Sequence, residues 1–323
     1  MKAVVCTQLG PPDKLEIQEI DLAEINDNQV LIDVEAAGIN FPDALLVQGK
    51  YQLVLDPPFI PGNEIAGIVK KVGKNVNIKV GTKVIGLPDI GGFAEEIILE
   101  KNSVIPIDNN FSSQVAAGLP INYGTTYYAL KRRGDLTKGE KLLVLGAAGG
   151  IGTASIQLGK AMGAEVYAAV GSDEKEEYVK NLDADHVIRY DKDNLKEKVK
   201  ELTNNIGVDV VVDPVGGDYS EEAIRGTAWN GRYLVIGFAN GPIPSIPLNL
   251  TLIKGISIVG VWWGRWMKTS PSEAMGDFTE LIDLIQNEKL LIEPSAVYSI
   301  EETPKALQNF LDRKNLGKAV IKF

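Results

Sequence analysis

The sequence predicts an α/β protein in which a doubly wound, parallel sheet of six strands is inserted into a β-rich domain. The first 120 residues are short β-rich runs separated by Pro and Gly, which indicates an irregular β domain. From residue 142 onward, apolar runs of strand length alternate with helical stretches. The carboxyl-terminal segment carries too little apolar material for a domain of its own, so we expect it to pack on the amino-terminal domain.

The amino-terminal segment, residues 1–122, and the middle segment, residues 123–265, differ in pattern. The first contains β-rich runs such as 30–36, 66–72 and 83–86. In the second, a glycine-rich turn follows the apolar run that starts at residue 142, and a helical pattern comes next, as in a βαβ unit. The predicted helices of this segment are 151–162, 174–182 and 195–203, and its further strands are 166–170, 186–189, 208–213, 233–237 and 256–261.

The last segment, residues 266–323, is predicted to complete the amino-terminal domain. It contains an amphipathic helix at 272–286, a strand at 296–299 and a helix at 304–312. The closing residues GKAVIKF are predicted to form a strand. The middle segment is then an insertion.

Composition excludes several classes of protein. The 323 residues contain 33 Lys plus Arg and 43 Asp plus Glu, a formal charge of −10, which disfavours nonspecific binding to nucleic acid. Cys6 is the single cysteine and His186 the single histidine, so no Cys/His zinc site can be assembled and only carboxylate metal sites remain open. The sequence shows neither a membrane-spanning apolar stretch nor a signal peptide, and we expect a cytoplasmic protein.

The glycine-rich turn, KLLVLGAAGGIG at residues 141–152, predicts a dinucleotide site. The N–H groups and the dipole at a helix start attract pyrophosphate, and glycine allows close approach to the backbone. Gly149 and Gly152 occupy the second and third glycine positions, whereas Ala147 stands at the first. The alternative is a turn that binds nothing. We expect the cofactor to contact Ala148, Gly149, Gly150 and Ile151.

The end of the second strand of the insertion favours NADPH over NADH. NAD-specific folds carry Asp or Glu at this place to bind the ribose hydroxyls. Here it is occupied by Val170, Gly171 and Ser172, and Lys175 follows one helical turn later. A cation without a competing carboxylate suits a 2′-phosphate. The alternative for Lys175 is a solvated helix lysine.

Several motifs in order carry a family resemblance. GAAGGIGTASIQLGKAMGA, GSDEK, DHVIRY, DPVGG and GRYLVIGF, with AAGINFPDALLVQGKY and PFIPGNEIAGIV before them, resemble the zinc-free medium-chain dehydrogenases/reductases, in the quinone oxidoreductase branch that includes ζ-crystallin. The resemblance implies a Rossmann domain inserted into a GroES-like catalytic domain. Two zinc-ligand positions of the related alcohol dehydrogenases are occupied by Asn40 and Asn63. Glu64 is expected to brace its loop.

The resemblance also implies roles for individual residues. Gly171, Lys175 and Tyr190 would surround the 2′-phosphate, and Thr125 and Phe238 would lie at the nicotinamide end. In the closing motif, Asn315 and Lys318 would lie where contact with the cofactor occurs. Thr125 has a plain alternative as a helix N-cap.

On the substrate side the resemblance implies Asn40, Asp43 and Tyr51 lining the cleft that faces the nicotinamide, with Asn40 and Tyr51 as the catalytic candidates. The alternatives are a turn residue for Asn40, the cap of a helix running toward Gln48 for Asp43, and a loop aromatic for Tyr51.

The expected activity is zinc-independent, NADPH-dependent reduction of quinones or other activated conjugated carbonyls. Reduction of an enone or enoyl thioester, as by an acryloyl-CoA reductase, stays open, as does an NADPH-binding structural or sensor protein. The phosphates of a CoA thioester could bind to Lys131, Arg132, Arg133 or Arg265, although we favour a solvated surface position for the first three. We also expect a homodimer through the sixth strand, with Trp262, Trp263 and Trp266 at an interface or a pocket wall.

Overall fold

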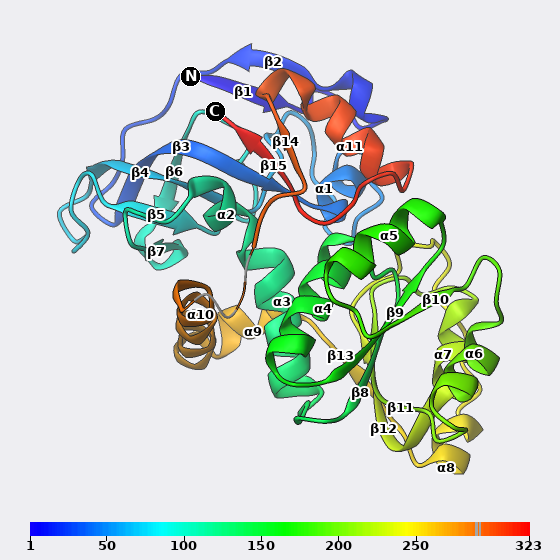
Figure 1. The fold of residues 1–323 in the computed structure, drawn as a ribbon. Coiled ribbons are helices and arrows are strands. Elements are labelled where there is room, and N and C mark those ends of the chain that lie inside the picture. The colour runs from blue at the N-terminus through cyan, green and yellow to red at the C-terminus, as the bar shows by residue number, and fades with distance from the viewer. Residues whose placement is uncertain (288–289, 291) are drawn as a thin grey trace. The chain divides into compact units, whose positions relative to one another are not determined.

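The computed structural model describes residues 1–287, 290 and 292–323. It divides into two compact units, the first comprising Met1–Ile121 with Ile292–Phe323 and the second Asn122–Leu291. Both ends of the chain belong to the first unit, as Figure 1 shows. The structure therefore inserts the second unit into the sequence of the first.

The first unit is built on a seven-stranded sheet in the order β14-β15-β3-β4-β5-β7, with β6 paired to β3. The carboxyl-terminal strand β15 runs antiparallel to β3, and Ile321 pairs with Ala37. The chain's last segment thus completes this sheet. A separate two-stranded sheet joins β1 and β2. The strands of the unit are β1 (Lys2–Val5), β2 (Glu16–Glu19), β3 (Gln29–Ile39), β4 (Ile65–Val72), β5 (Lys83–Gly86), β6 (Glu96–Glu100), β7 (Val104–Pro106), β14 (Ala296–Tyr298) and β15 (Ala319–Lys322).

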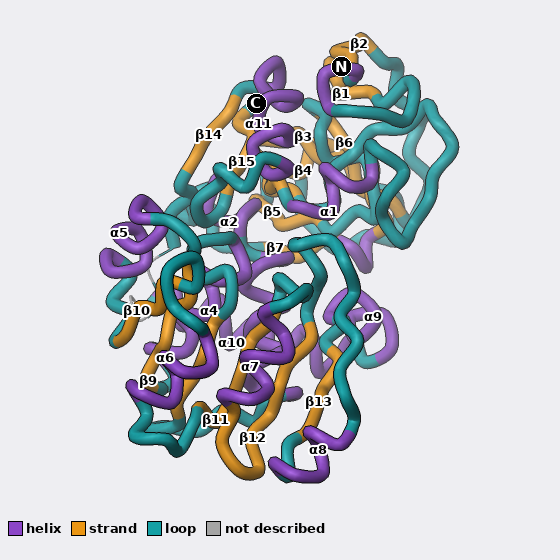
Figure 2. The backbone as a smooth tube through the Cα atoms, turned by 90° about the vertical axis from the view of Figure 1, so that its right-hand side faces the viewer, coloured by secondary structure: helices purple, strands orange, loops and turns teal. Residues whose placement is uncertain are grey.

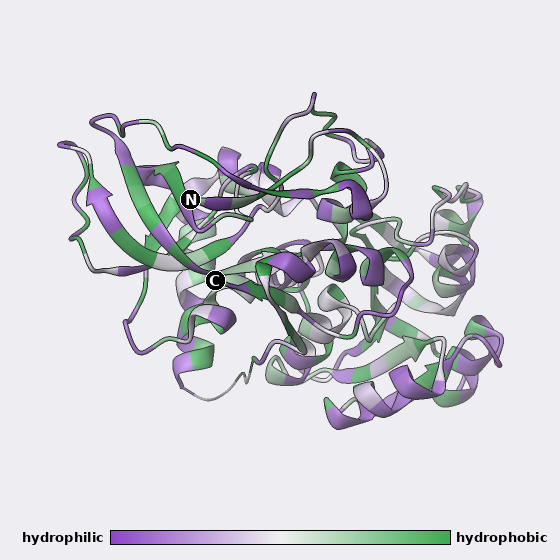
Figure 3. Ribbon diagram, turned by 90° about the horizontal axis from the view of Figure 1, so that it is seen from above, coloured by the Kyte–Doolittle hydropathy of each residue, from purple (hydrophilic) through white to green (hydrophobic). Residues whose placement is uncertain are grey.

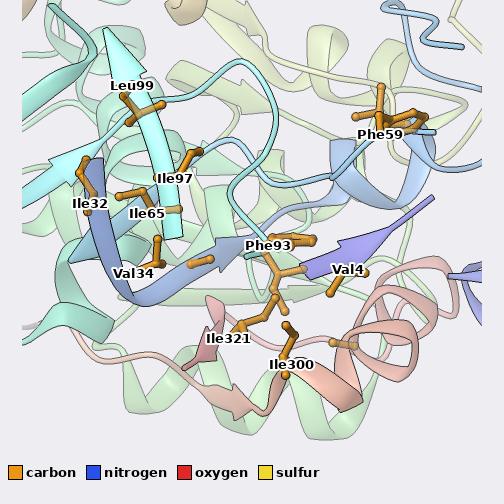
Figure 4. Packing of buried hydrophobic residues seen from close by; sticks show 14 of the residues in the cluster. Val4, Ile32, Val34, Phe59, Ile65, Phe93, Ile97, Leu99, Ile300 and Ile321 are labelled. Atoms are coloured by element: carbon orange, nitrogen blue, oxygen red, sulfur yellow. The ribbon is translucent and has the colours of Figure 1, made fainter. Parts of the chain in front are cut away.

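The core of this unit joins residues from both ends of the sequence (Figure 4). Ile32 and Ile65 from adjacent strands pack in the same cluster as Ile300 and Ile321 from the carboxyl-terminal segment. The helices α1 (Phe41–Leu46), α2 (Ser113–Gly118) and α11 (Thr303–Leu311) belong to the same unit. Burial of this apolar surface holds the two ends of the sequence in one domain.

The second unit contains a parallel six-stranded sheet in the order β10-β9-β8-β11-β12-β13. This is the doubly wound Rossmann order, so the predicted fold class is confirmed. Figure 2 shows β11, β12 and β13 running side by side. The short strand expected at His186 is present. The strands are β8 (Lys141–Val144), β9 (Glu165–Val170), β10 (His186–Arg189), β11 (Val208–Asp213), β12 (Thr227–Val235) and β13 (Ser257–Gly260).

Helices connect successive strands of this sheet. Apolar residues concentrate along the strands and hydrophilic ones on the helices, as Figure 3 shows in green and purple. Leu143, Tyr167, Val211 and Leu234 are buried within the sheet. The connecting helices are α4 (Gly150–Ala161), α5 (Asp173–Asn181), α6 (Leu195–Leu202), α7 (Tyr219–Gly226) and α8 (Asn249–Lys254).

The second unit ends later than the sequence predicts. The prediction closed it at residue 265, whereas it continues to Leu291 and includes α9 (Trp263–Thr269) and α10 (Pro271–Gln286). The reason lies in the contacts of α10. Its carboxylate Asp277 accepts hydrogen bonds from Arg132 at 2.8 and 2.9 Å and from Lys131 at 2.8 Å, and its apolar residues Ala274, Phe278 and Leu281 are buried.

Among the helices within the described ranges, none is long and apolar enough to cross a membrane.

Candidate active site

The glycine-rich turn between β8 and α4 has the geometry of a phosphate-binding loop. Gly146 adopts φ +56°, a conformation that favours glycine, and its carbonyl accepts a 2.9 Å hydrogen bond from Gly149. Gly149 is the N-cap of α4, and the first intrahelical hydrogen bond is donated by Thr153 to Gly149. The N–H groups before Thr153 therefore have no intrahelical acceptor, and the first turn of α4 contains no acidic residue.

Asn122 is a neighbour of this turn that sequence reasoning missed. It is buried, and a Cβ at Gly150 would overlap its side-chain amide. A tertiary contact thus favours glycine at position 150. No local signal in the sequence marks Asn122, because the two residues meet only through the fold.

The predicted phosphate-binding residues at the end of β9 lie together. The ring of Tyr190 packs against Gly171, where a Cβ would come within 2.8 Å of a ring carbon. Ser172 is the N-cap of α5, and its Oγ accepts a 3.3 Å hydrogen bond from the backbone N–H of Lys175. Tyr190 also lies 4.5 Å, between ring centroids, from Tyr219. Lys175, in the first turn of α5, is half-buried.

Arg189, next to Tyr190, forms a group of ion pairs that the sequence did not indicate. Its guanidinium pairs with Asp173, with Glu176 at 2.9 Å and with Asp191 at 2.8 Å. Hydrogen bonds from Arg189 and Lys192 lower the pKa of Asp173 to about 2. Four of the five N–H donors of Arg189 serve these carboxylates, so Arg189 contributes little net positive charge to this end of the sheet.

The loop that carries Phe238 is held by Asp213. Asp213 is buried at the end of β11 and accepts from the backbone N–H groups of Val215 and Gly216, at 2.7 and 2.8 Å. It also accepts from the hydroxyls of Ser220, at 2.9 Å, and Tyr233. Phe238 packs on Gly216, where a Cβ would come within 2.8 Å of its ring. Asp213 therefore braces the turn on which the predicted nicotinamide residue rests.

The first unit contains a buried polar group that we name the Glu64 cluster: Asn40, Asp43, Glu64 and Lys318, each 3% exposed or less. The Nζ of Lys318 pairs with Glu64 and donates to the Oδ1 of Asn40 at 2.7 Å and to the carbonyl of Ile39 at 3.2 Å. Glu64 also accepts from the amide of Asn40 at 2.7 Å and from the backbone N–H of Ile121 at 2.8 Å. Glu64 thus braces its surroundings, as expected.

Lys318 cannot serve the cofactor in the way its motif implied. Its ammonium group has three donors, and Ile39, Asn40 and Glu64 accept all three. Asn315, from the same motif, donates to the carbonyl of Gly317 at 3.3 Å and lies in the first unit.

The start of α1 departs from the predicted capping. Asn40, and not Asp43, is the N-cap residue, and Asp43 lies inside the helix at its third position. From there Asp43 accepts a 2.8 Å hydrogen bond from the backbone N–H of Asn40. Burial raises the pKa of Asp43 to about 7, although hydrogen bonds from Asn40 and Gly62 oppose the shift.

Tyr51 is half-buried and packs against the core of the first unit. Burial, with the nearby charge of Asp43, raises the pKa of its phenol. The hydroxyl therefore stays protonated at neutral pH and can donate a hydrogen bond.

Thr125 is not a helix N-cap, because the backbone before it is already helical. Gly124, the residue that precedes α3 (Thr125–Tyr127), has φ −61° and ψ −46°. The turns on either side of α3 are π-helical, so Thr125 lies inside a continuous helical stretch. The capping alternative for Thr125 is therefore wrong.

Three of the four basic residues considered for thioester phosphates are engaged elsewhere, while Arg265 is exposed. Lys131 and Arg132 pair with Asp277, and Arg133 donates to the carbonyl of Gly260 at 3.1 Å.

The three tryptophans have different surroundings. Trp262 is 69% exposed, Trp263 is buried against Gly124, and Trp266 stacks on Tyr128 with 4.4 Å between the ring centroids. Trp263 and Trp266 line a small cavity with Tyr127 and Phe278.

In the part of the chain that the structure describes, no group of three His, Cys, Asp or Glu side chains could hold a metal ion. Asn40 and Asn63, at the expected zinc-ligand positions, contact each other, with Asn40 Nδ2 donating to Asn63 Oδ1 at 3.3 Å.

Comparison with known proteins agrees with this fold. A family model described as an alcohol dehydrogenase GroES-like domain matches residues 26–109, and one described as a zinc-binding dehydrogenase matches residues 150–287. Quinone oxidoreductase-like protein 2 homolog of Nematostella vectensis is 38% identical over 326 residues, covering 99% of this chain and 88% of that protein.

Two solved structures are informative. Quinone oxidoreductase of Escherichia coli, complexed with NADPH, superposes with a TM-score of 0.92 at 26% identity, covering 100% of both chains. The CurK enoyl reductase superposes with a TM-score of 0.87 at 26% identity, covering 99% of this chain and 98% of that one.

A Rossmann sheet of this order inserted into a GroES-like unit defines an oxidoreductase of the medium-chain dehydrogenase/reductase class. The chain belongs to the zinc-free quinone oxidoreductase family of that class.

Proposed function

We propose that this protein is an NADPH-dependent reductase of quinones or other activated conjugated carbonyls that works without zinc. The observation that carries the proposal is the Glu64 cluster, where a lysine ammonium and an asparagine amide occupy the surroundings in which a zinc enzyme of this class would hold metal ligands. Without a Lewis acid to polarise a simple ketone, substrates that are already electron-poor are favoured.

The second unit fits NADPH. The N–H groups at the start of α4 suit the pyrophosphate, since the first turn contains no acidic residue. Gly171, Ser172, Lys175 and Tyr190 would hold the 2′-phosphate end. Ala148, Gly149, Gly150 and Ile151 would contact the pyrophosphate, and Thr125 and Phe238 the nicotinamide end, with Asn315 as a further proposed contact.

When bound, NADPH supplies the hydride. The protein's own residues then orient the acceptor, exclude water and stabilise negative charge on the acceptor oxygen. We propose Asn40 and Tyr51 as the substrate-side residues. Tyr51 can donate a hydrogen bond because its phenol stays protonated. The proton that completes the reduction of a quinone comes from water.

A second candidate is reduction of the carbon–carbon double bond of an enone or enoyl thioester. The likeness to an enoyl reductase favours it. The engagement of Lys131 and Arg132 by Asp277 removes two of the cations that could have bound thioester phosphates. An NADPH-binding sensor or structural protein is the rival of another class.

The test is consumption of NADPH and of NADH by the metal-free protein with an ortho-quinone, a para-quinone, a conjugated enone and acryloyl-CoA. Rapid oxidation of NADPH by a quinone, with little by the thioester, is the expected result. The reverse order would make the protein an enoyl reductase. Stabilisation of the fold by NADPH without oxidation by any acceptor would favour the sensor.

We further propose a homodimer formed through β13. It is an edge strand, and Ile258 on it is 39% exposed, with Trp262 following at 69%. An apolar strand edge of this kind is a template for pairing with another chain. Sedimentation velocity should show a dimer that Ile258→Lys converts to monomer, while Ile206→Lys, at an apolar residue exposed elsewhere, stays dimeric. A monomeric wild-type protein would contradict the proposal.

We propose the cytoplasm as the location, because the single buried thiol of Cys6 is compatible with a reducing compartment. Fractionation of cells would test this.

A further inference from the structure

Lys318, Asn40 and Asn63 form a directed chain of hydrogen bonds. The ammonium of Lys318 donates to Asn40 Oδ1 at 2.7 Å. The Nδ2 of Asn40 donates to Glu64 at 2.7 Å and to Asn63 Oδ1 at 3.3 Å. Both N–H bonds of the Asn40 amide are thus used within the protein, and the residue is 3% exposed. While these bonds hold, Asn40 has no N–H to offer a substrate.

The same chain orients Asn63. Because its Oδ1 faces Asn40, its Nδ2 points to the opposite side of the amide group. Asn63 is half-buried, unlike the other members of the chain. Within the described residues no atom accepts a hydrogen bond from Asn63 Nδ2. Asn63 therefore presents a fixed amide donor that nothing in the described part of the chain satisfies.

We propose that Asn63 is the residue that donates a hydrogen bond to the carbonyl oxygen of the acceptor, and that Asn40 and Lys318 are positioning residues for it. The inference rests on the proposed function, and it moves the donor role from Asn40 to its neighbour. Hydrogen bonds in a chain polarise one another, so the ammonium at one end strengthens the donor at the other. The buried ion pair with Glu64 fixes that ammonium in place.

The chemistry of the reduction balances with Asn63 in this role. The acceptor gains a hydride and a proton, the two electrons come from NADPH, which becomes NADP⁺, and the proton comes from water. As the hydride arrives, the electron pair of the acceptor moves onto its oxygen. A donor aimed at that oxygen stabilises the charge as it develops.

The first test compares Asn63→Ala with the wild-type protein and with Asn75→Ala. Asn75 is a matched control, since it is an exposed asparagine of the same unit whose amide donates to Asn28 at 3.2 Å. We expect Asn63→Ala to lower kcat by roughly 10²-fold, the usual cost of losing one such donor. The Kd for NADPH, measured by fluorescence, should stay unchanged. Full activity of Asn63→Ala would overturn the proposal.

The second test does not depend on turnover. The protein loaded with NADP⁺ cannot donate hydride, so para-benzoquinone can be held on it and its carbonyl band recorded by infrared difference spectroscopy. A donated hydrogen bond moves that band to lower frequency. We expect the shift in the wild-type protein and in Asn75→Ala, and its loss in Asn63→Ala. An equal shift in all three would overturn the role of Asn63, even if the wild-type protein reduced no acceptor and the proposed function had failed.

The positioning role is tested with Lys318→Met/Glu64→Gln, which removes both buried charges and leaves no unpaired ion. We expect an intermediate carbonyl shift and a kcat between those of the wild-type protein and Asn63→Ala, with an unchanged Kd for NADPH. A wild-type band position in this double variant would show that the ammonium does not act through Asn40.

Discussion

The carboxylate of Glu64 and the ammonium of Lys318 form an ion pair in which the side chains are 0% and 3% exposed. The two residues are 254 positions apart in the sequence. The pair joins the amino-terminal part of the first unit to the segment before β15. Both of its members are hydrogen-bonded to the side-chain amide of Asn40.

Removing one charge of this ion pair should lower the unfolding free energy much more than removing both charges. Lys318→Met leaves the Glu64 carboxylate buried and uncompensated, which is expected to lower the unfolding free energy by about 3–5 kcal/mol. Lys318→Met/Glu64→Gln should recover a large part of that loss. Urea denaturation of the three proteins measures this. A double variant less stable than Lys318→Met would contradict it.

The raised pKa of Asp43 predicts a specific pH dependence of stability. The folded carboxyl keeps its proton up to about pH 7, whereas the unfolded one ionises at its ordinary value. Between about pH 4 and 7 the folded state binds more protons, so the unfolding free energy falls as pH rises. Asp43→Asn removes this titration, and its stability relative to the wild-type protein should rise by roughly 2–4 kcal/mol across the window. A constant difference from pH 4 to 7 would show that Asp43 is ionised in the folded protein throughout.

Lys175 should distinguish the two nicotinamide cofactors. Lys175→Ala is expected to weaken NADPH binding roughly tenfold, the loss of one charge-assisted contact, and to leave NADH binding nearly unchanged. Isothermal titration with both cofactors measures this. Lys180→Ala is the control, because Lys180 lies on the same helix α5 and is exposed. Equal weakening of NADPH and NADH would show that Lys175 supports the helix and not the phosphate.

Substitution of Asp213 should lower the stability of the protein more than substitution of any one of its hydrogen-bond partners. Asp213→Ala removes the hydrogen-bond acceptor of two backbone N–H groups and two hydroxyls in a buried turn, whereas Tyr233→Phe removes one hydroxyl. We expect Tyr233→Phe to cost about 1–2 kcal/mol of stability and Asp213→Ala several times that. Because Phe238 rests on this turn, Asp213→Ala should also weaken NADPH binding. Equal effects of the two variants on thermal unfolding and on the Kd would refute the bracing role.

Patterns with a short period were sufficient to predict most of the fold. The helix predicted at 195–203 is Leu195–Leu202 and the strand predicted at 208–213 is Val208–Asp213, because alternating apolar runs and helical periodicity are local signals. The end of the second unit was mispredicted at residue 265. That boundary depends on the pairing of Asp277 with Arg132, which no local pattern encodes.

The site shows the same division. Gly149, Gly171 and Lys175 are predicted to bind the cofactor from adjacent residues alone, namely a glycine-rich turn and a lysine one turn into a helix. Asn122 against Gly150, the carboxylates around Arg189 and the engagement of Lys318 were not predicted. Each is a contact between side chains from separate elements.

The sequence by itself determined the class of fold, the turn suited to a dinucleotide and the amides at the two expected zinc positions. These follow from residue type and spacing along the chain. Only the tertiary structure decided what those amides do, because the packing of β3, β4 and the segment before β15 brings Asn40, Asn63 and Lys318 into one hydrogen-bonded chain. The amide of Asn40 donates to Glu64 and to Asn63, so both of its N–H groups are used, whereas the amide N–H groups of Asn63 have no acceptor among the described residues.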